Sequence, residues 1–232
     1  MSSYLLDGDG YAMVEFYDYV NDFGLLYNQP IPGLYYFPVS GDKILESKIK
    51  NTYLSSVKTK IQWESVGTGA NSRQVVHYGY KYNYKTGNTS EPAPPMPPNI
   101  EALRKSAWSL LNEVNMKKAP LDQCIINKYE PGQGINAHTD HKNYGDVICC
   151  YTIGSGASMI FTNLKTKKTI ELYVHPGSWY IMMGEARWEW KHEMKSRKTD
   201  ILKGVKIPRK TRISITFRSI GSCKEDREPK VL

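Results

Sequence analysis

The second half of the chain consists of short runs of β-branched and aromatic residues that are separated by turn-forming residues. The runs occupy residues 124–129, 147–153, 158–161, 169–174, 178–183 and 212–218. Glycine and proline lie between them, in Glu130-Pro131-Gly132, Gly154-Ser155-Gly156 and His175-Pro176-Gly177, which are compositions typical of turns. Short strands at near-regular spacing predict a double-stranded β-helix, the jelly-roll or cupin-like arrangement of two packed sheets.

The first half mixes strand and helix patterns. The pattern of residues 31–36 predicts a short strand, and the aromatic and β-branched content of residues 75–84 predicts another. Apolar residues at helical spacing predict helices over 44–54 and 100–114. Five prolines within residues 91–98 remove backbone donors and predict a loop there. The fold class is therefore α+β, mainly β, with the helices flanking the sheets.

The length of 232 residues and a hydrophobic content of 40% suit one core. We expect an N-terminal extension over residues 1–30, one domain over 31–220 and a polar tail over 221–232. No apolar run is long enough to span a membrane, and the N-terminus lacks the pattern of a signal peptide. These features predict a soluble intracellular protein, and they leave its oligomeric state open.

The cysteine pattern points to a reducing compartment. No CxxC pair occurs among the four cysteines, which are Cys124, Cys149, Cys150 and Cys223. Neither a disulfide framework nor a four-cysteine zinc site therefore fits their spacing. The neighbours Cys149 and Cys150 should point to opposite faces of a strand. Reduced thiols predict a cytoplasmic or nuclear location.

A formal charge of +8 and seventeen tyrosines favour an anionic partner such as nucleic acid. Basic runs at residues 165–168, 191–198 and 203–210 can line a phosphate track. A basic protein with solvated lysine loops and tyrosines packed in the core is the plainer alternative.

One histidine of the five stands two residues before a carboxylate, in His138-Thr139-Asp140. In extended backbone, positions i and i+2 project from the same face, so the two side chains can converge on one metal ion. A distant histidine can complete a facial triad, which leaves open positions on Fe(II) for a bidentate cosubstrate and oxygen. The motif alone also fits an ordinary hydrogen-bonded histidine and a turn aspartate.

The last strand places two arginines on one face. Alternation puts Arg212, Ser214, Thr216 and Arg218 together, and Ile213, Ile215 and Phe217 on the opposite face. An inward-facing guanidinium requires a partner, and a dicarboxylate supplies a bidentate one. An edge strand with a solvated basic face is the alternative.

Five segments in order resemble the AlkB-like oxygenases. They are Asn127-Lys128-Tyr129-Glu130-Pro131-Gly132, His138-Thr139-Asp140, residues 177–187 with Met183-Gly184-Glu185-Ala186-Arg187, Trp190-Lys191-His192, and residues 212–218. Several motifs in the right order are far more specific than any one of them. The resemblance spans roughly residues 31–220.

The resemblance implies an Fe(II)- and 2-oxoglutarate-dependent dioxygenase that also consumes O2. His138, Asp140 and His192 would ligate the iron. Arg212 would bind the distal carboxylate of 2-oxoglutarate, and the residues implied beside it are Asn127, Tyr129, Ser214 and Arg218.

The substrate implied by the resemblance is an alkylated base in RNA or single-stranded DNA. Residues 76–82, which include Tyr78, Tyr80 and Tyr82, together with 95–97, are similar to the family's N-terminal nucleotide-recognition lid, which suits a base turned out of its stack. A plain β-hairpin with packed tyrosines is the alternative. His141 and Lys142 follow Asp140 where DNA-repair members tend to carry acidic residues.

Three other functions remain open from the sequence. Residues 129–135 and 77–80 look closest to the branch of the family that hydroxylates a modified wobble uridine in tRNA. Other branches hydroxylate or demethylate protein side chains. A non-catalytic nucleic-acid-binding module is the alternative outside enzymes.

Overall fold

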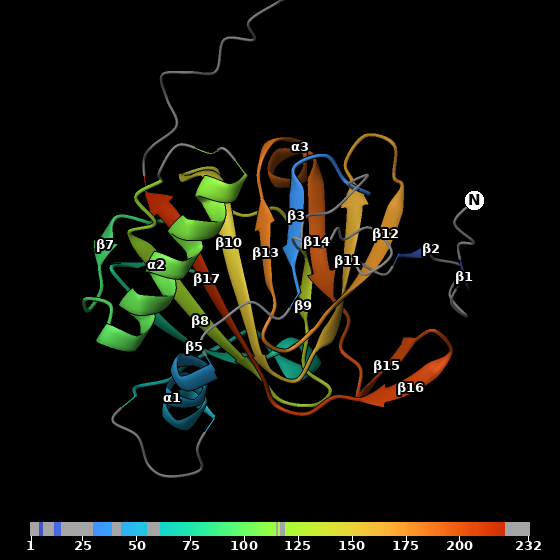
Figure 1. The fold of residues 1–232 in the computed structure, drawn as a ribbon, viewed down its shortest axis with the longest axis horizontal. Helices are drawn as coiled ribbons and strands as arrows, with labels where there is room; N and C mark the ends of the chain where they lie inside the picture. Colours follow the sequence, from blue (N-terminus) through green and yellow to red (C-terminus); the bar gives the residue numbers. More distant parts are fainter. Residues whose placement is uncertain are drawn as a thin grey trace, which may run out of the picture.

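The computed structural model describes residues 5–6, 12–14, 30–38, 43–54, 61–114, 116 and 119–220. Two β-sheets pack face to face, and helices cover the outer side of the larger sheet (Figure 1). This arrangement confirms the predicted double-stranded β-helix with flanking helices. The expected tail over 221–232 and most of the expected extension over 1–30 lie outside the described residues.

The larger sheet has seven strands, and its hydrogen-bonded neighbours are antiparallel. In spatial order they are β3 (Leu34–Phe37), β13 (Trp179–Met182), β10 (Tyr144–Gly154), β17 (Arg212–Ile220), β8 (Gln123–Tyr129), β5 (Arg73–Tyr78) and β4 (Glu64–Val66). The long central strands β10 and β17 pair along most of their length.

The smaller sheet has six strands. In spatial order they are β1 (Leu5–Leu6), β2 (Ala12–Val14), β12 (Thr169–Val174), β11 (Ala157–Asn163), β14 (Trp190–Met194) and β9 (Ile135–His138). The β2–β12 pair is parallel and the others are antiparallel. Two separate hairpins join β15 (Thr199–Leu202) to β16 (Val205–Pro208), and β6 (Tyr80–Lys81) to β7 (Glu91–Pro92).

Side-chain alternation divides the interior into two apolar clusters. One lies between the sheets, and the other lies between the larger sheet and helices α1 (Lys43–Tyr53) and α2 (Pro98–Glu113). Cys150 belongs to the first cluster and Cys149 to the second, as their adjacent positions on one strand predict. Ile213, Ile215 and Phe217 all face the helices. The polar residues of β17 are therefore turned towards the space between the sheets.

The predicted strand over 75–84 was too long, because β5 ends at Tyr78. The next residue, Gly79, has a φ of +74°, and a Cβ there would lie 1.9 Å from the Asp122 carbonyl oxygen. Only glycine fits such a position, and the chain turns there. The short strands β9 and β14 and the β15–β16 hairpin carried too little apolar pattern to be predicted.

Within the described parts of the chain, no helix is long and apolar enough to cross a membrane. The three cysteines that the structure describes are free and buried.

Candidate metal centre

Three predicted ligands converge between the sheets. His138 ends β9, Asp140 follows two residues later, and His192 lies in the middle of β14. The antiparallel pairing of β9 with β14 sets His192 opposite His138, with their ring centroids 4.4 Å apart. One ligand atom from each of the three side chains lies within 4.8 Å of the others. Sheet register thus brings together residues that are about fifty positions apart in sequence.

The hydrogen bonds of the cluster leave metal-binding atoms available. His138 Nδ1 lies 2.8 Å from the carbonyl oxygen of Asn136. A carbonyl can only accept, so Nδ1 is the donor in this bond and Nε2 is the ring nitrogen left to face a metal ion. Asp140 Oδ2 is buried and has no hydrogen-bond partner among the described residues. An unpaired buried carboxylate oxygen beside two imidazoles suits a divalent cation.

Electrostatics keep the cluster in its ligating form. Burial lowers the pKa of His192 to about 3, so its imidazole is neutral at pH 7. Burial would raise the pKa of Asp140, but the electrostatic effects of its neighbours, Arg218 first among them, together outweigh burial and hold that pKa below its ordinary range. The three residues therefore present two imidazoles and one carboxylate, the set that Fe(II) takes in a facial triad.

A second buried arginine supports the loop that carries Asp140. Arg187, in α3 (Gly184–Trp188), donates to the carbonyl oxygens of Asp140 at 3.1 Å, His141 at 2.9 Å and Gly145 at 3.2 Å. Arg187 belongs to the Met183-Gly184-Glu185-Ala186-Arg187 motif, but the sequence alone predicted no role for it. Its donors add hydrogen bonds to the carbonyls of this tight turn and so support the loop that carries Asp140.

A small cavity of about 40 Å³ lies beside the triad, along the polar face of β17. Arg212 lines it and is only 4% exposed. Its Nη2 donates to Thr152 Oγ1 at 3.1 Å, its Nε has no partner, and no acidic side chain pairs with it among the described residues. A buried guanidinium without a carboxylate is costly. The arrangement fits a carboxylate ligand, which a dicarboxylate cosubstrate would supply.

The other predicted cosubstrate residues line the same cavity. The ring of Tyr129 lies 5.7 Å from the Arg212 guanidinium carbon, and Ser214 Oγ lies 3.1 Å from Cys150 Sγ. Asn127 Oδ1 accepts a hydrogen bond from Arg73 Nε at 2.9 Å. Arg73 was not predicted, because it stands on a distant strand with no motif around it.

A wider cleft of about 430 Å³ opens beside the triad, and His138 and Asp140 form part of its wall. Tyr82, Tyr84, Tyr144 and His141 line it, and the Tyr82 ring lies 4.9 Å from Tyr84, 5.9 Å from His141 and 6.1 Å from Tyr144. Of the three tyrosines predicted from the sequence to bind the substrate, Tyr82 is the one that lines this cleft. Tyr84 carried no separate signal, although it belongs to the same tyrosine-rich segment.

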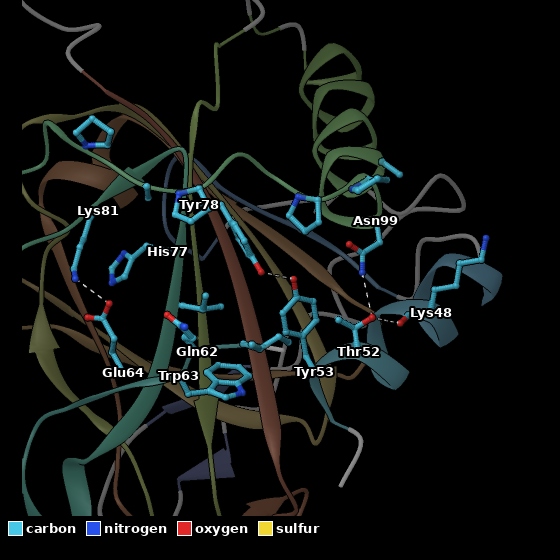
Figure 2. A pocket seen from close by; sticks show the side chains of 18 of the residues that line it. Lys48, Thr52, Tyr53, Gln62, Trp63, Glu64, His77, Tyr78, Lys81 and Asn99 are labelled. Atoms are coloured by element: carbon cyan, nitrogen blue, oxygen red, sulfur yellow. Dashed lines mark hydrogen bonds and ion pairs between the residues drawn. The ribbon is translucent and has the colours of Figure 1, made fainter. Parts of the chain in front are cut away.

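The other two predicted substrate tyrosines lie elsewhere. The Tyr78 side chain is on the opposite face of β5, where its hydroxyl lies 3.1 Å from that of Tyr53 (Figure 2). It lines a separate cavity of about 1270 Å³ that α1, β5 and the proline-rich segment enclose. Tyr80, on β6, lines neither this cavity nor the cleft. Residues 76–78 belong to the larger sheet, so the recognition lid stays a prediction.

The fold is a double-stranded β-helix with two histidines and one aspartate between its sheets, next to a buried arginine that has no acidic partner among the described residues. These features together define a class of protein. That class is the mononuclear, non-haem Fe(II) oxygenases that use 2-oxoglutarate and O2.

Comparisons with known proteins agree with this class. Residues 46–218 match the family model described as the 2OG-Fe(II) oxygenase superfamily. The chain therefore belongs to this superfamily, as an AlkB-like 2-oxoglutarate-dependent dioxygenase.

Two relatives show different coverage. The uncharacterized protein L905 of Acanthamoeba polyphaga mimivirus is 40% identical over 158 residues, which is 64% of this chain and 74% of that protein. The tRNA (carboxymethyluridine(34)-5-O)-methyltransferase alkbh8 of Xenopus tropicalis is 32% identical over 201 residues. This match covers 76% of this chain but 31% of the Xenopus protein.

Among solved structures, that of OsALKBH1 superimposes with a TM-score of 0.62 and 16% identity, covering 84% of this chain and 99% of that one. At this identity the likeness concerns the fold.

Proposed function

We propose that this dioxygenase oxidises an alkylated base in RNA or single-stranded DNA. The observation that carries the proposal is the aromatic-walled cleft of about 430 Å³ that is also lined by His138 and Asp140 of the metal cluster. Aromatic faces stack on any base, and an extruded base needs such a pocket. The net charge of +8 supports an anionic substrate.

In this proposal the buried polar residues divide the work. His138, Asp140 and His192 hold Fe(II), and Arg218 orients the Asp140 carboxylate. Arg212 binds the distal carboxylate of 2-oxoglutarate, with Asn127, Tyr129 and Ser214 around it. Tyr82 and Tyr84 stack against the base and exclude water from the reacting face.

The bound iron, with 2-oxoglutarate and O2, supplies oxidation of a nearby C–H bond to an alcohol, coupled to formation of succinate and carbon dioxide. On an N-methyl group the product alcohol is a hemiaminal, which breaks down to formaldehyde and the free amine. On a carbon that bears no nitrogen the hydroxyl remains. The product thus reports which kind of carbon lies in the cleft.

Hydroxylation of a modified wobble uridine in tRNA is a second candidate. It is supported by relatives whose names refer to carboxymethyluridine at position 34, including one from Mus musculus that is 36% identical over 130 residues. This chain spans only 31% and 19% of those two proteins. Their whole activity therefore comes to this chain only as a hypothesis.

Mass spectrometry of oligonucleotides tests the proposal. Methylated RNA and DNA strands and a tRNA anticodon stem-loop with the modified uridine are incubated with enzyme, Fe(II), ascorbate and 2-oxoglutarate. Loss of a methyl group or gain of one oxygen is expected in a single-stranded substrate, and the His138→Ala variant should give neither. A panel without products, combined with one added oxygen on a protein from cell extract, would favour a protein side chain instead.

A further inference from the structure

The β15–β16 hairpin projects from the double sheet (Figure 1). It is inserted between β14, which carries His192, and β17, which carries Arg212. Lys203 and Gly204 form its two-residue turn with φ values of +49° and +75°, as in the tight type I′ turn. An isolated two-stranded hairpin is only marginally stable in water, so contacts at its base must hold it in place.

A cluster of buried charges supplies those contacts. Arg209 binds both carboxylate oxygens of Asp200, with Nε 2.6 Å from Oδ2 and Nη2 2.7 Å from Oδ1. Arg197 donates to Asp200 Oδ1 at 2.8 Å and to Glu171 of β12. The Asp200 and Glu171 side chains are each 1% exposed. Such a cluster is weak evidence for added stability, but its directional bonds can set the orientation of the hairpin on the smaller sheet.

The base of the hairpin also touches the wall of the substrate cleft. The Ser196 hydroxyl lies 2.6 Å from Asn71 Oδ1 and 2.8 Å from the Ala70 carbonyl oxygen. Asn71 itself lines the cleft together with His138 and Asp140. A strand that leaves the cleft on this side therefore passes next to the hairpin.

The exposed charges of the hairpin region are all positive. Lys198, Lys206 and Lys210 are exposed and take part in no ion pair among the described residues. Asp200 is the one acidic residue between positions 195 and 212, and its carboxylate is buried and paired with arginines of the cluster. Lys206 pairs across the hairpin with Ile201, on the face opposite to Asp200. Lys206 therefore lies on the face of the hairpin away from the anchoring carboxylate of Asp200.

We propose that the β15–β16 hairpin is an arm that binds the phosphate backbone of the nucleic-acid strand beyond the reacting nucleotide. This inference rests on the proposed function and extends it to the flanking strand. The lysines contribute affinity that depends on salt and not on sequence. The Arg209–Asp200–Arg197 cluster holds the arm beside the cleft, so that the strand is bound on the side where it leaves the site.

Two matched triple variants test the arm. Lys198→Ala/Lys206→Ala/Lys210→Ala removes three exposed positive charges of the arm, while Lys43→Ala/Lys48→Ala/Lys105→Ala removes three exposed lysines on the helices, outside the basic runs. Binding of a fluorescent single-stranded RNA oligonucleotide is measured against salt concentration. Each lost phosphate contact reduces the slope of log K against log salt by about 0.7 for a single strand, so the arm variant should lose about 2. The control variant should keep the wild-type slope.

The outcomes separate the arm from the proposed function. Oxidised nucleotide from wild-type enzyme, combined with equal slopes in the two variants, would overturn the arm alone. No oxidised nucleotide in any strand would refute the proposed substrate, whereas a slope reduced only in the arm variant would still support the arm as a nucleic-acid contact. A wild-type enzyme whose RNA binding is independent of salt would overturn the arm directly.

Discussion

Arg218 Nη2 lies 3.1 Å from Asp140 Oδ1, and the two side chains are 9% and 6% exposed. The Arg218 guanidinium also lies over the ring of Tyr144, 5.0 Å from its centroid. The ion pair uses one oxygen of the carboxylate and leaves the other, Oδ2, without a hydrogen-bond partner among the described residues. Arg218 of β17 thereby orients Asp140, a candidate iron ligand in the connection that follows β9. Arg212, on the same face of β17, remains available for the cosubstrate.

Replacing Arg218 by Gln should weaken metal binding. The carboxylate of Asp140 would lose the donor that orients it, and loss of such a partner typically costs 10- to 100-fold in metal affinity, which is roughly the effect expected here. Calorimetry with Mn(II) under nitrogen measures it. Arg212→Gln is the matched control, since it removes a buried arginine from the same strand face and should leave Mn(II) affinity close to wild type. Equal losses in the two variants would contradict the division of roles.

Replacing Arg212 by Gln should weaken binding of 2-oxoglutarate. Loss of one partner of a buried charge pair costs about 2–5 kcal/mol, which corresponds to an affinity loss of roughly thirty-fold or more. Calorimetry with 2-oxoglutarate on the Mn(II)-loaded enzyme measures the change. A cosubstrate affinity that is unchanged in Arg212→Gln would refute the assignment of Arg212.

Stability should fall in acid partly through Asp200. Burial alone raises the pKa of Asp200, but its hydrogen bonds with Arg209 and Arg197 outweigh burial, so the pKa lies below its ordinary value in the folded state. A carboxyl of this kind stabilises the fold above its unfolded pKa, and the contribution is lost as pH falls through the folded value. The free energy of unfolding of wild type should therefore drop from about pH 5 downward.

Urea unfolding followed by tryptophan fluorescence measures this dependence. The Asp200→Asn variant should be less stable at neutral pH, by about 3–5 kcal/mol for a broken buried pair, and its stability should change less in acid. Glu113→Gln, at an exposed position on α2, should keep the wild-type profile. An Asp200→Asn profile with the wild-type acid slope would show that the carboxyl is not responsible.

The two faces of the tyrosine-rich segment should differ in function. Tyr82→Leu removes an aromatic wall of the cleft, and stacking of a base is worth about 1–3 kcal/mol, so kcat/KM on an oligonucleotide substrate should fall roughly tenfold. Tyr78→Leu changes the opposite face of β5 and should leave kcat/KM near wild type. Kinetics on one methylated RNA strand compares the two variants. An equal loss in both would support the original assignment of Tyr78 to the substrate.

Local patterns accounted for much of the fold and part of the site. The alternation of residues 212–218 placed the arginines on one face and the three apolar side chains on the helix side, because a strand has a side-chain period of two. The His138-x-Asp140 motif identified two of the three clustered side chains, although β9 ends at His138 and Asp140 lies in the connection that follows. Arg73 and the position of Tyr78 could not be predicted in this way, since they depend on which strand lies beside β8.

The sequence by itself determined the double β-sheet, the chemical identity of the site and the family, because periodicity and short motifs are encoded over a few neighbouring residues. Only the tertiary structure decided that His192 lies opposite His138, that Arg187 supports the Asp140 loop, and that buried arginines anchor the β15–β16 hairpin. These relationships join residues up to about fifty positions apart. They arise from sheet register and from the need to pair every buried charge. Both depend on contacts between segments that are distant in sequence, so no single segment predicts them.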